Sequence, residues 1–212
     1  MTDWKACITE RLAGSGPRHS PEEWLLPGLS REATRALRAH LPQTLAAAAV
    51  LVPLVERGPE LTVLLTQRAD ELKSHAGQIS FPGGRLEAGE SARAGALREA
   101  QEEIGLDPVF VKVVGYLPDH VLLSGFRVTP VVAFVRAGFE LQLASEEVRG
   151  TFEVPLSHVF EPANHRMRRR RFSKDGPEFE VYDISFEAHS IWGATAGMLI
   201  ALYRLCASEG AR

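Results

Sequence analysis

One stretch of sequence, from Gly84 to Leu106, constrains the fold more tightly than any other part of the chain. It reads GRLEAGESARAGALREAQEEIGL and directly follows a glycine-rich turn. Residues three and four positions apart lie on the same side of a helix, so Glu99, Glu102 and Glu103 are expected to share one helical face. Apolar residues occupy another side of this helix, namely Ala96, Leu97, Ala100 and Ile104. A helix with one buried face and one acidic face is therefore expected, with Ser91 suited to its N-cap and Gly105 to its C-terminal end.

The acidic face indicates a bound cation. Carboxylates this close repel one another unless a positive charge lies among them. Oxygen ligands of this kind suit Mg²⁺ or Mn²⁺, and the chemistry that follows is metal-assisted cleavage of a phosphate anhydride. The alternative is a solvated, charged helix face, which is the commoner reason for an acidic cluster.

The spacing of residues through this stretch favours the metal site. It runs Gly84, five residues, Glu90, seven residues, Arg98-Glu99, an apolar residue, any residue, Glu102-Glu103, any residue, Gly105 and apolar Leu106. This pattern resembles the Nudix box, and all nine specified positions match. The resemblance implies an α/β protein with the Nudix fold, a mixed β-sheet sandwiched between helices (α/β/α). It also implies hydrolysis of nucleoside diphosphates linked to another group.

The resemblance also assigns roles to individual residues. The metal ligands would be Glu99, Glu102, Glu103 and the carbonyl of Gly83. Glu99 or a nearby loop acid would polarise the attacking water. Glu147 is slightly preferred over Glu146 as that loop acid, because apolar Val148 follows it, although both are equally explained as surface acids.

Four residues of the box would have structural roles, namely Gly84, Glu90, Arg98 and Gly105. Glu90 and Arg98 would form the ion pair that fixes the loop against the helix. Arg98 lies about 100° around the helix from Glu99, so it is expected off the metal face.

A second motif precedes the box and points to a substrate class. The segment from Leu64 to Gly84 reads LLTQRADELKSHAGQISFPGG and resembles the motif that marks the coenzyme A pyrophosphatase branch of the Nudix family. The one departure is Lys73 where the motif has arginine, which keeps the charge but loses the bidentate fork. The candidate substrate-binding residues are Arg68, Lys73, His75 and Gln78. A solvated connection between a strand and a turn explains these four side chains equally well.

The two motifs together imply hydrolysis of coenzyme A or acyl-coenzyme A to 4′-phosphopantetheine, or its acyl form, and adenosine 3′,5′-bisphosphate. A Nudix pyrophosphatase acting on ADP-ribose, NADH or another nucleoside diphosphate derivative is the nearest alternative. A non-catalytic nucleotide-binding Nudix module is a third, disfavoured because such proteins usually lose box glutamates and this chain keeps them all.

Five arginines lie within six positions, from Arg166 to Arg171. A nucleic-acid patch is disfavoured, because aromatic residues do not interleave with the arginines and the net charge of the chain is −3. A solvated strand or loop edge is favoured instead. One arginine of the run could also reach inward to a phosphate of the substrate.

Composition excludes several other classes. The chain of 212 residues is 45% hydrophobic and 24% charged, as is ordinary for a globular protein. The apolar stretch from Leu45 to Leu54 is too short to span a bilayer, and no secretory leader opens the chain. Cys7 and Cys206 lie near opposite ends and are expected as free thiols in the cytoplasm. A homodimer is possible, and no membrane partner is expected.

The expected organisation is one domain with additions at both ends. Residues 1–42 form an N-terminal extension packed on the core, with a helical piece from Ser30 to His40. Residues 43–207 form the Nudix hydrolase domain, and residues 208–212 a short tail. The expected strands of this domain, in chain order, are Ala46–Leu54, Leu61–Thr66, Val109–Tyr116 and Val128–Val135.

Further elements are expected in the C-terminal part of the chain. Glu146 to Thr151 is expected as a loop, and Leu156 to Val159 as a helical turn. Phe172 and the run from Phe179 to Ser185 indicate a hairpin, and Ile191 to Ala207 indicates a terminal helix.

Overall fold

The computed structural model describes residues 3–17, 44–69, 77–122, 124–171 and 178–207. The strands are β1 (Ala46–Arg57), β2 (Glu60–Arg68), β3 (Ile79–Ser80), β4 (Gly83–Arg85), β5 (Val111–Tyr116), β6 (His120–Val121), β7 (Phe126–Val135), β8 (Val148–Pro155), β9 (Arg166–Arg171), β10 (Glu178–Phe186) and β11 (His189–Trp192). The helices are α1 (Trp4–Leu12), α3 (Ala92–Ile104), α4 (Leu156–Val159) and α5 (Gly193–Ala207), with the 3₁₀ turns η2 (Pro108–Phe110) and η3 (Pro162–Asn164).

The main sheet is mixed. Its strands run in the order β3-β2-β1-β7-β5, with β4, β6 and β8 joined to β1, β7 and β2 respectively. The central pair, β1 and β7, is parallel from Ala46 and Phe126 to Val55 and Val135. The other pairs of this sheet are antiparallel.

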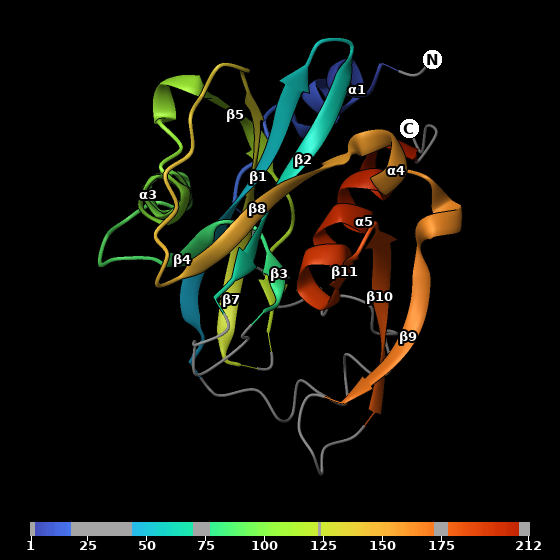
Figure 1. The fold of residues 1–212 in the computed structure, drawn as a ribbon. Helices are drawn as coiled ribbons and strands as arrows, with labels where there is room; N and C mark the ends of the chain where they lie inside the picture. The colour runs from blue at the N-terminus through green and yellow to red at the C-terminus, as the bar shows by residue number, and fades with distance from the viewer. Residues whose placement is uncertain (1–2, 18–43, 70–76, 123, 172–177, 208–212) are drawn as a thin grey trace.

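Successive side chains of the central strands point to opposite faces of the sheet, so the core is divided into two apolar clusters, one on each face. Ala49, Leu51 and Val55 of β1 belong to the apolar cluster that includes α3. Val52 and Leu54 point the other way, into the cluster that includes residues of α1, α4 and α5. Figure 1 shows the sheet lying between α3 on one side and α4 and α5 on the other. The predicted layering of a mixed sheet between helices is confirmed.

The helix α3 forms where the sequence predicts it. The hydroxyl of Ser91 accepts a hydrogen bond from the backbone N–H of Ala94 at 3.2 Å. At the other end, Gly105 adopts the left-handed conformation with φ of 69°. Ala96, Ala100 and Ile104 are buried against the sheet, so two alanines let the helix approach the strands closely.

Two expectations about strands are wrong. Val148 to Thr151 is part of β8 and not a loop, because these residues pair with the end of β2, Thr66 opposite Thr151 and Arg68 opposite Val148. Val109 and Phe110 belong to a 3₁₀ turn, whose first residue is Pro108, rather than to β5.

The arginine run lies at the edge of a second, three-stranded sheet of the described chain, ordered β11-β10-β9. The predicted strand near Phe179 is β10, which pairs with the arginine strand β9. The terminal helix begins two residues later than expected, because Ile191 pairs with Ile184 in this sheet and Gly193, with φ of 64°, turns the chain into α5.

The first helix, α1, packs against α5 and β5 (Figure 1). Residues 18–42 of the expected extension, with the helical piece Ser30–His40, and the tail 208–212 lie outside the described residues. No helix in the described ranges is both long and apolar enough to cross a bilayer.

Candidate active site

The glycine-rich turn before the box lies directly on β1. The backbone N–H of Leu51 donates to the carbonyl of Pro82 at 2.9 Å, and Gly83 pairs with Val50. A Cβ at Gly83 would collide with the Ala49 carbonyl oxygen and lie 2.6 Å from the Val50 Cα. Glycine is therefore required here, and the close approach fixes the turn under α3.

The next glycine makes room for an acid of the box. A Cβ on Gly84 would lie 2.5 Å from the carboxylate carbon and from both carboxylate oxygens of Glu99. The carboxylate of Glu99 thus occupies the space that any larger residue at position 84 would need.

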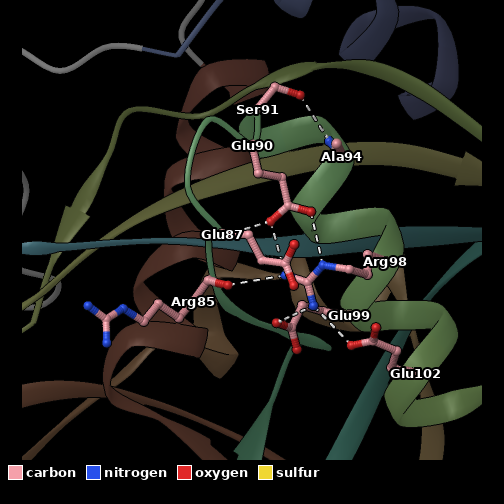
Figure 2. Close-up of polar contacts among 8 residues, drawn as sticks. All are labelled: Arg85, Glu87, Glu90, Ser91, Ala94, Arg98, Glu99 and Glu102. Carbon is pink, nitrogen blue, oxygen red and sulfur yellow. Dashed lines mark hydrogen bonds and ion pairs between the residues drawn. The ribbon is translucent and has the colours of Figure 1, made fainter.

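A single guanidinium joins the loop to the helix. Arg98 donates from Nε to Glu90 Oε1 at 2.9 Å and from Nη2 to Glu90 Oε2 at 3.0 Å. Its Nη2 also donates to the Arg85 carbonyl at 3.2 Å, while the Glu87 N–H donates to Glu90 at 2.9 Å. The hydrogen bonds from Arg98 lower the pKa of Glu90, and Glu90 raises the pKa of Arg98. The expected ion pair is thus present as a bidentate contact (Figure 2).

The third nitrogen of Arg98 reaches the acidic face. Arg98 Nη1 donates to Glu99 Oε1 and to Glu102 Oε2, both at 2.9 Å (Figure 2). The expectation that Arg98 lies off this face is wrong. Its Cβ points about 100° around the helix from that of Glu99, but the long side chain brings the guanidinium to both Glu99 and Glu102. In this state the guanidinium is the positive charge between two of the three acids.

The third acid is buried. Glu103 is 5% exposed and accepts a hydrogen bond from the Gly83 N–H at 3.2 Å. Burial raises the pKa of Glu103 to about 7, with the negative charges of Glu99 and Glu147 acting in the same direction. The Gly83 hydrogen bond and the charge of Arg68 oppose that rise.

The charge effects bring a loop acid into the same cluster. Burial raises the pKa of Glu99, and the charges of Glu102 and Glu147 add to the rise while Arg98 opposes it. The loop that carries Glu147 crosses the end of α3, where the Ala144 N–H donates to the Glu103 carbonyl at 2.9 Å. Exposed Glu147 therefore lies within electrostatic reach of Glu99 and Glu103, although some forty residues separate them in sequence.

The upstream motif meets the acids at the end of β2. Arg68 is half-buried, and its Nε is the one buried side-chain nitrogen or oxygen within the described ranges that has no hydrogen-bond partner. The Arg68 N–H donates to the Gln78 carbonyl at 3.0 Å, which joins these two predicted residues. Lys73 and His75 lie outside the described residues.

The donor set fits a hard dication, but its oxygens do not converge on one point. Within the part of the chain that the structure describes, no three His, Cys, Asp or Glu side chains are arranged to hold a metal. The reason is that Arg98 binds Glu99 and Glu102, while Gly83 binds Glu103. Four clustered carboxylates with one guanidinium among them have the chemistry of a Mg²⁺ or Mn²⁺ site, and a cation would have to displace the contacts of Arg98 Nη1.

The arginine strand is separate from this cluster. Arg168 Nε lies 3.5 Å from a carboxylate oxygen of the buried Asp183, and Arg169 lies 3.7 Å from exposed Glu180. These two side chains thus pair across the strands with acids of β10, which agrees with the predicted strand edge.

Sequence reasoning missed one residue of the box. Gly95 lies one turn before Arg98, and a Cβ there would collide with Leu86 and lie 3.0 Å from Glu90 Oε2. The signal was present, because a residue three positions before Arg98 shares its helical face and must leave room for the loop.

A family model and curated relatives each match more than half of the chain. The model of the NUDIX domain matches residues 44–176. The uncharacterized Nudix hydrolase NudL of Salmonella paratyphi B is 39% identical over 153 residues, covering 72% of this chain and 78% of that protein, and NudL of Salmonella newport matches equally. A Caenorhabditis elegans (C. elegans) Ap4A hydrolase structure is 21% identical over 52% of this chain and 80% of its own, with a TM-score of 0.44. A MutT/nudix family protein from Enterococcus faecalis is 16% identical over 82% of this chain and 68% of its own, with a TM-score of 0.46.

Proposed function

This chain belongs to the Nudix hydrolase family, and from that premise we propose that it cleaves the pyrophosphate bond of coenzyme A or acyl-coenzyme A. The products are adenosine 3′,5′-bisphosphate and 4′-phosphopantetheine or its acyl form. The family accounts for hydrolysis of a phosphoanhydride, and the proposal adds the substrate.

The observation that carries the proposal is the position of Arg68. This residue belongs to the motif that resembles the coenzyme A pyrophosphatase branch, and its charge lowers the pKa of the box acid Glu103, so the two lie within electrostatic reach. Its buried Nε lacks an acceptor among the described residues. A buried donor without a partner is unfavourable, and a phosphate oxygen is an acceptor that a guanidinium binds well.

The residues around Arg68 divide the work of hydrolysis. Glu99, Glu102 and Glu103 would hold the cations, and Mg²⁺ or Mn²⁺ bound there would neutralise charge on the phosphate oxygens. Glu99 or Glu147 orients the attacking water and accepts its proton. If a cation replaced Arg98 at Glu99 and Glu102, Arg98 would still keep its bidentate contact with Glu90 and so would keep the loop in place.

A product assay tests the substrate. The purified protein is incubated with Mg²⁺ or Mn²⁺ and coenzyme A, acetyl-coenzyme A, ADP-ribose or NADH, and the products are identified by mass. Adenosine 3′,5′-bisphosphate should form from the two coenzyme A compounds, well ahead of products from the others. AMP from ADP-ribose or NADH alone would contradict the coenzyme A assignment while keeping the hydrolase.

Two variants extend the assay, one as a control for contaminating activity and one as a test of substrate binding. Glu102→Gln should abolish turnover of every substrate, which excludes a contaminating phosphatase. Arg68→Gln should raise KM for coenzyme A, because it removes a phosphate contact. No product from any substrate would favour a nucleotide-binding module that does not hydrolyse.

A further inference from the structure

The fold brings together the only two cysteines of the chain. Cys7 lies in α1 and Cys206 in the last turn of α5, 199 positions apart. The Cys7 thiol donates to the Cys206 carbonyl oxygen, with sulfur and oxygen 3.8 Å apart. The Cys7 side chain also raises the pKa of the Cys206 thiol. Both side chains are half-buried, so a small reagent can reach them.

Aromatic packing holds the two helices in this position. Trp4 of α1 packs edge-on against Phe160, with ring centroids 4.8 Å apart, and Phe160 packs against Tyr203 of α5 at 5.6 Å. Ile8, which directly follows Cys7, and Leu202, one turn before Cys206, are both fully buried in the same apolar cluster. The contact between the two cysteines therefore lies beside the packed core rather than at loose chain ends.

We propose that Cys7 and Cys206 form a thiol pair that a low-molecular-weight disulfide oxidises to an intramolecular crosslink between the first and last helices. In the first step the Cys7 thiolate attacks one sulfur of the reagent, which gives a mixed disulfide and releases one reagent thiolate. In the second step the Cys206 thiolate attacks the Cys7 sulfur and displaces the other reagent thiolate. Two protein thiols are oxidised, one reagent disulfide is reduced, and two protons pass to solvent.

The order of attack follows from the surroundings of Cys206. Burial raises the pKa of Cys206 to about 12, contact with Cys7 adds to the rise, and the charge of Arg11 opposes it. Because the thiolate is the nucleophile, Cys7 reacts first and Cys206 resolves the mixed disulfide. The second step should accordingly become faster as the pH rises.

The crosslink should stabilise the fold without changing the hydrolytic site. It closes a loop of 199 positions, and a loop of that length greatly restricts the unfolded chain. The acids of the box lie on α3, which covers the opposite face of the sheet (Figure 1). The crosslink does not depend on which substrate the enzyme cleaves.

The experiment oxidises the full-length protein at low micromolar concentration with oxidised glutathione, at about pH 7 and about pH 9. Intact mass should fall by two hydrogens, and peptide mapping should join the peptides of Cys7 and Cys206. The thermal midpoint should rise by roughly 5–15 °C and return on reduction. Turnover measured beside the reduced protein should be unchanged.

Matched variants complete the test. Cys7→Ser and Cys206→Ser should each take up at most one glutathione and show no rise in the thermal midpoint. A wild type that ends with glutathione on both cysteines, or that crosslinks only between molecules on a non-reducing gel, would overturn the proposal. So would an intramolecular disulfide that leaves the thermal midpoint unchanged.

Discussion

Arg98 binds Glu90 through two parallel hydrogen bonds, Nε to Oε1 at 2.9 Å and Nη2 to Oε2 at 3.0 Å. This bidentate contact ties the loop before α3 to the middle of the helix. The same guanidinium uses Nη1 to bind Glu99 and Glu102. Arg98 therefore braces the loop and also partners the acids, whereas Glu90 acts only on the loop.

Replacing Glu90 by Gln should lower stability and, through the loop, activity. The change removes a charge-assisted pair whose side chains are only 12% and 25% exposed, so the thermal midpoint should fall by roughly 3–10 °C. Thermal unfolding near neutral pH measures this. Glu87→Gln, at an exposed position of the same loop, is the control and should change the midpoint little. Equal midpoints for Glu90→Gln and wild type would show that the pair does not brace the loop.

The sequence predicts α3 and its place in the fold well, because the capping residues and the apolar stripe are local features. It does not predict where the Arg98 guanidinium lies. The step of about 100° per residue fixes only the direction in which each Cβ atom points, and the end of a long side chain can reach a neighbouring face of the helix. It also misses the strand at Val148, whose pairing with Arg68 depends on a partner eighty residues away. The contact between Cys7 and Cys206 is likewise set only by tertiary packing.

Gly84→Ala should impair catalysis more than stability. The new Cβ would lie 2.5 Å from the Glu99 carboxylate, which must then move away from its place beside the turn. We expect kcat to fall at least about tenfold, since small displacements of reacting groups have large effects on rate. Gly150→Ala is the control, because nothing lies within 4 Å of its Cβ. Comparable kcat values for the two variants would show that Glu99 does not need this position.

Glu102→Gln and Glu103→Gln should each lower kcat by orders of magnitude with the fold intact. Glu102 is exposed, so its loss removes a charge but little packing. In the Glu103→Gln variant the new amide oxygen can still accept the hydrogen bond from the Gly83 N–H, which preserves the local contact. Turnover with saturating Mg²⁺ or Mn²⁺ measures the effect, and circular dichroism checks the fold. Near-normal turnover with ample metal would contradict the assignment of the ligands.

The two loop acids offer a matched comparison. Glu147 raises the pKa of both Glu99 and Glu103 through its charge, whereas Glu146 is not among the main contributors to either shift. We expect Glu147→Gln to lower kcat at least about tenfold and Glu146→Gln to leave it within about twofold of wild type. The ratio of the two kcat values, measured at one metal concentration, decides the matter. Equal values would remove Glu147 from the catalytic residues.

The last prediction concerns stability at acid pH and depends on His120 of β6. Burial lowers the pKa of His120 to about 4. The hydrogen bond with the Pro118 carbonyl and the charge of Asp119 oppose this shift. The unfolded chain takes up a proton at its ordinary pKa of 6.5, while the folded protein remains neutral at this position down to about 4. Acidification through that range therefore favours the unfolded state, and the stability that neutral His120 contributes above the range is lost, by up to about 3 kcal/mol.

His120→Gln tests this because glutamine stays neutral and can still donate to the Pro118 carbonyl. The variant should have a lower free energy of unfolding than wild type at about pH 7.5, since glutamine fits a buried ring site poorly. This difference in free energy between the two proteins should narrow or reverse at about pH 4.5. Urea unfolding of both proteins at the two pH values gives the difference in their free energies of unfolding at each pH. Other titrating groups act alike in the two proteins, so their effects cancel in the difference. A difference that stays constant with pH would mean that folded His120 accepts a proton as readily as the unfolded chain does.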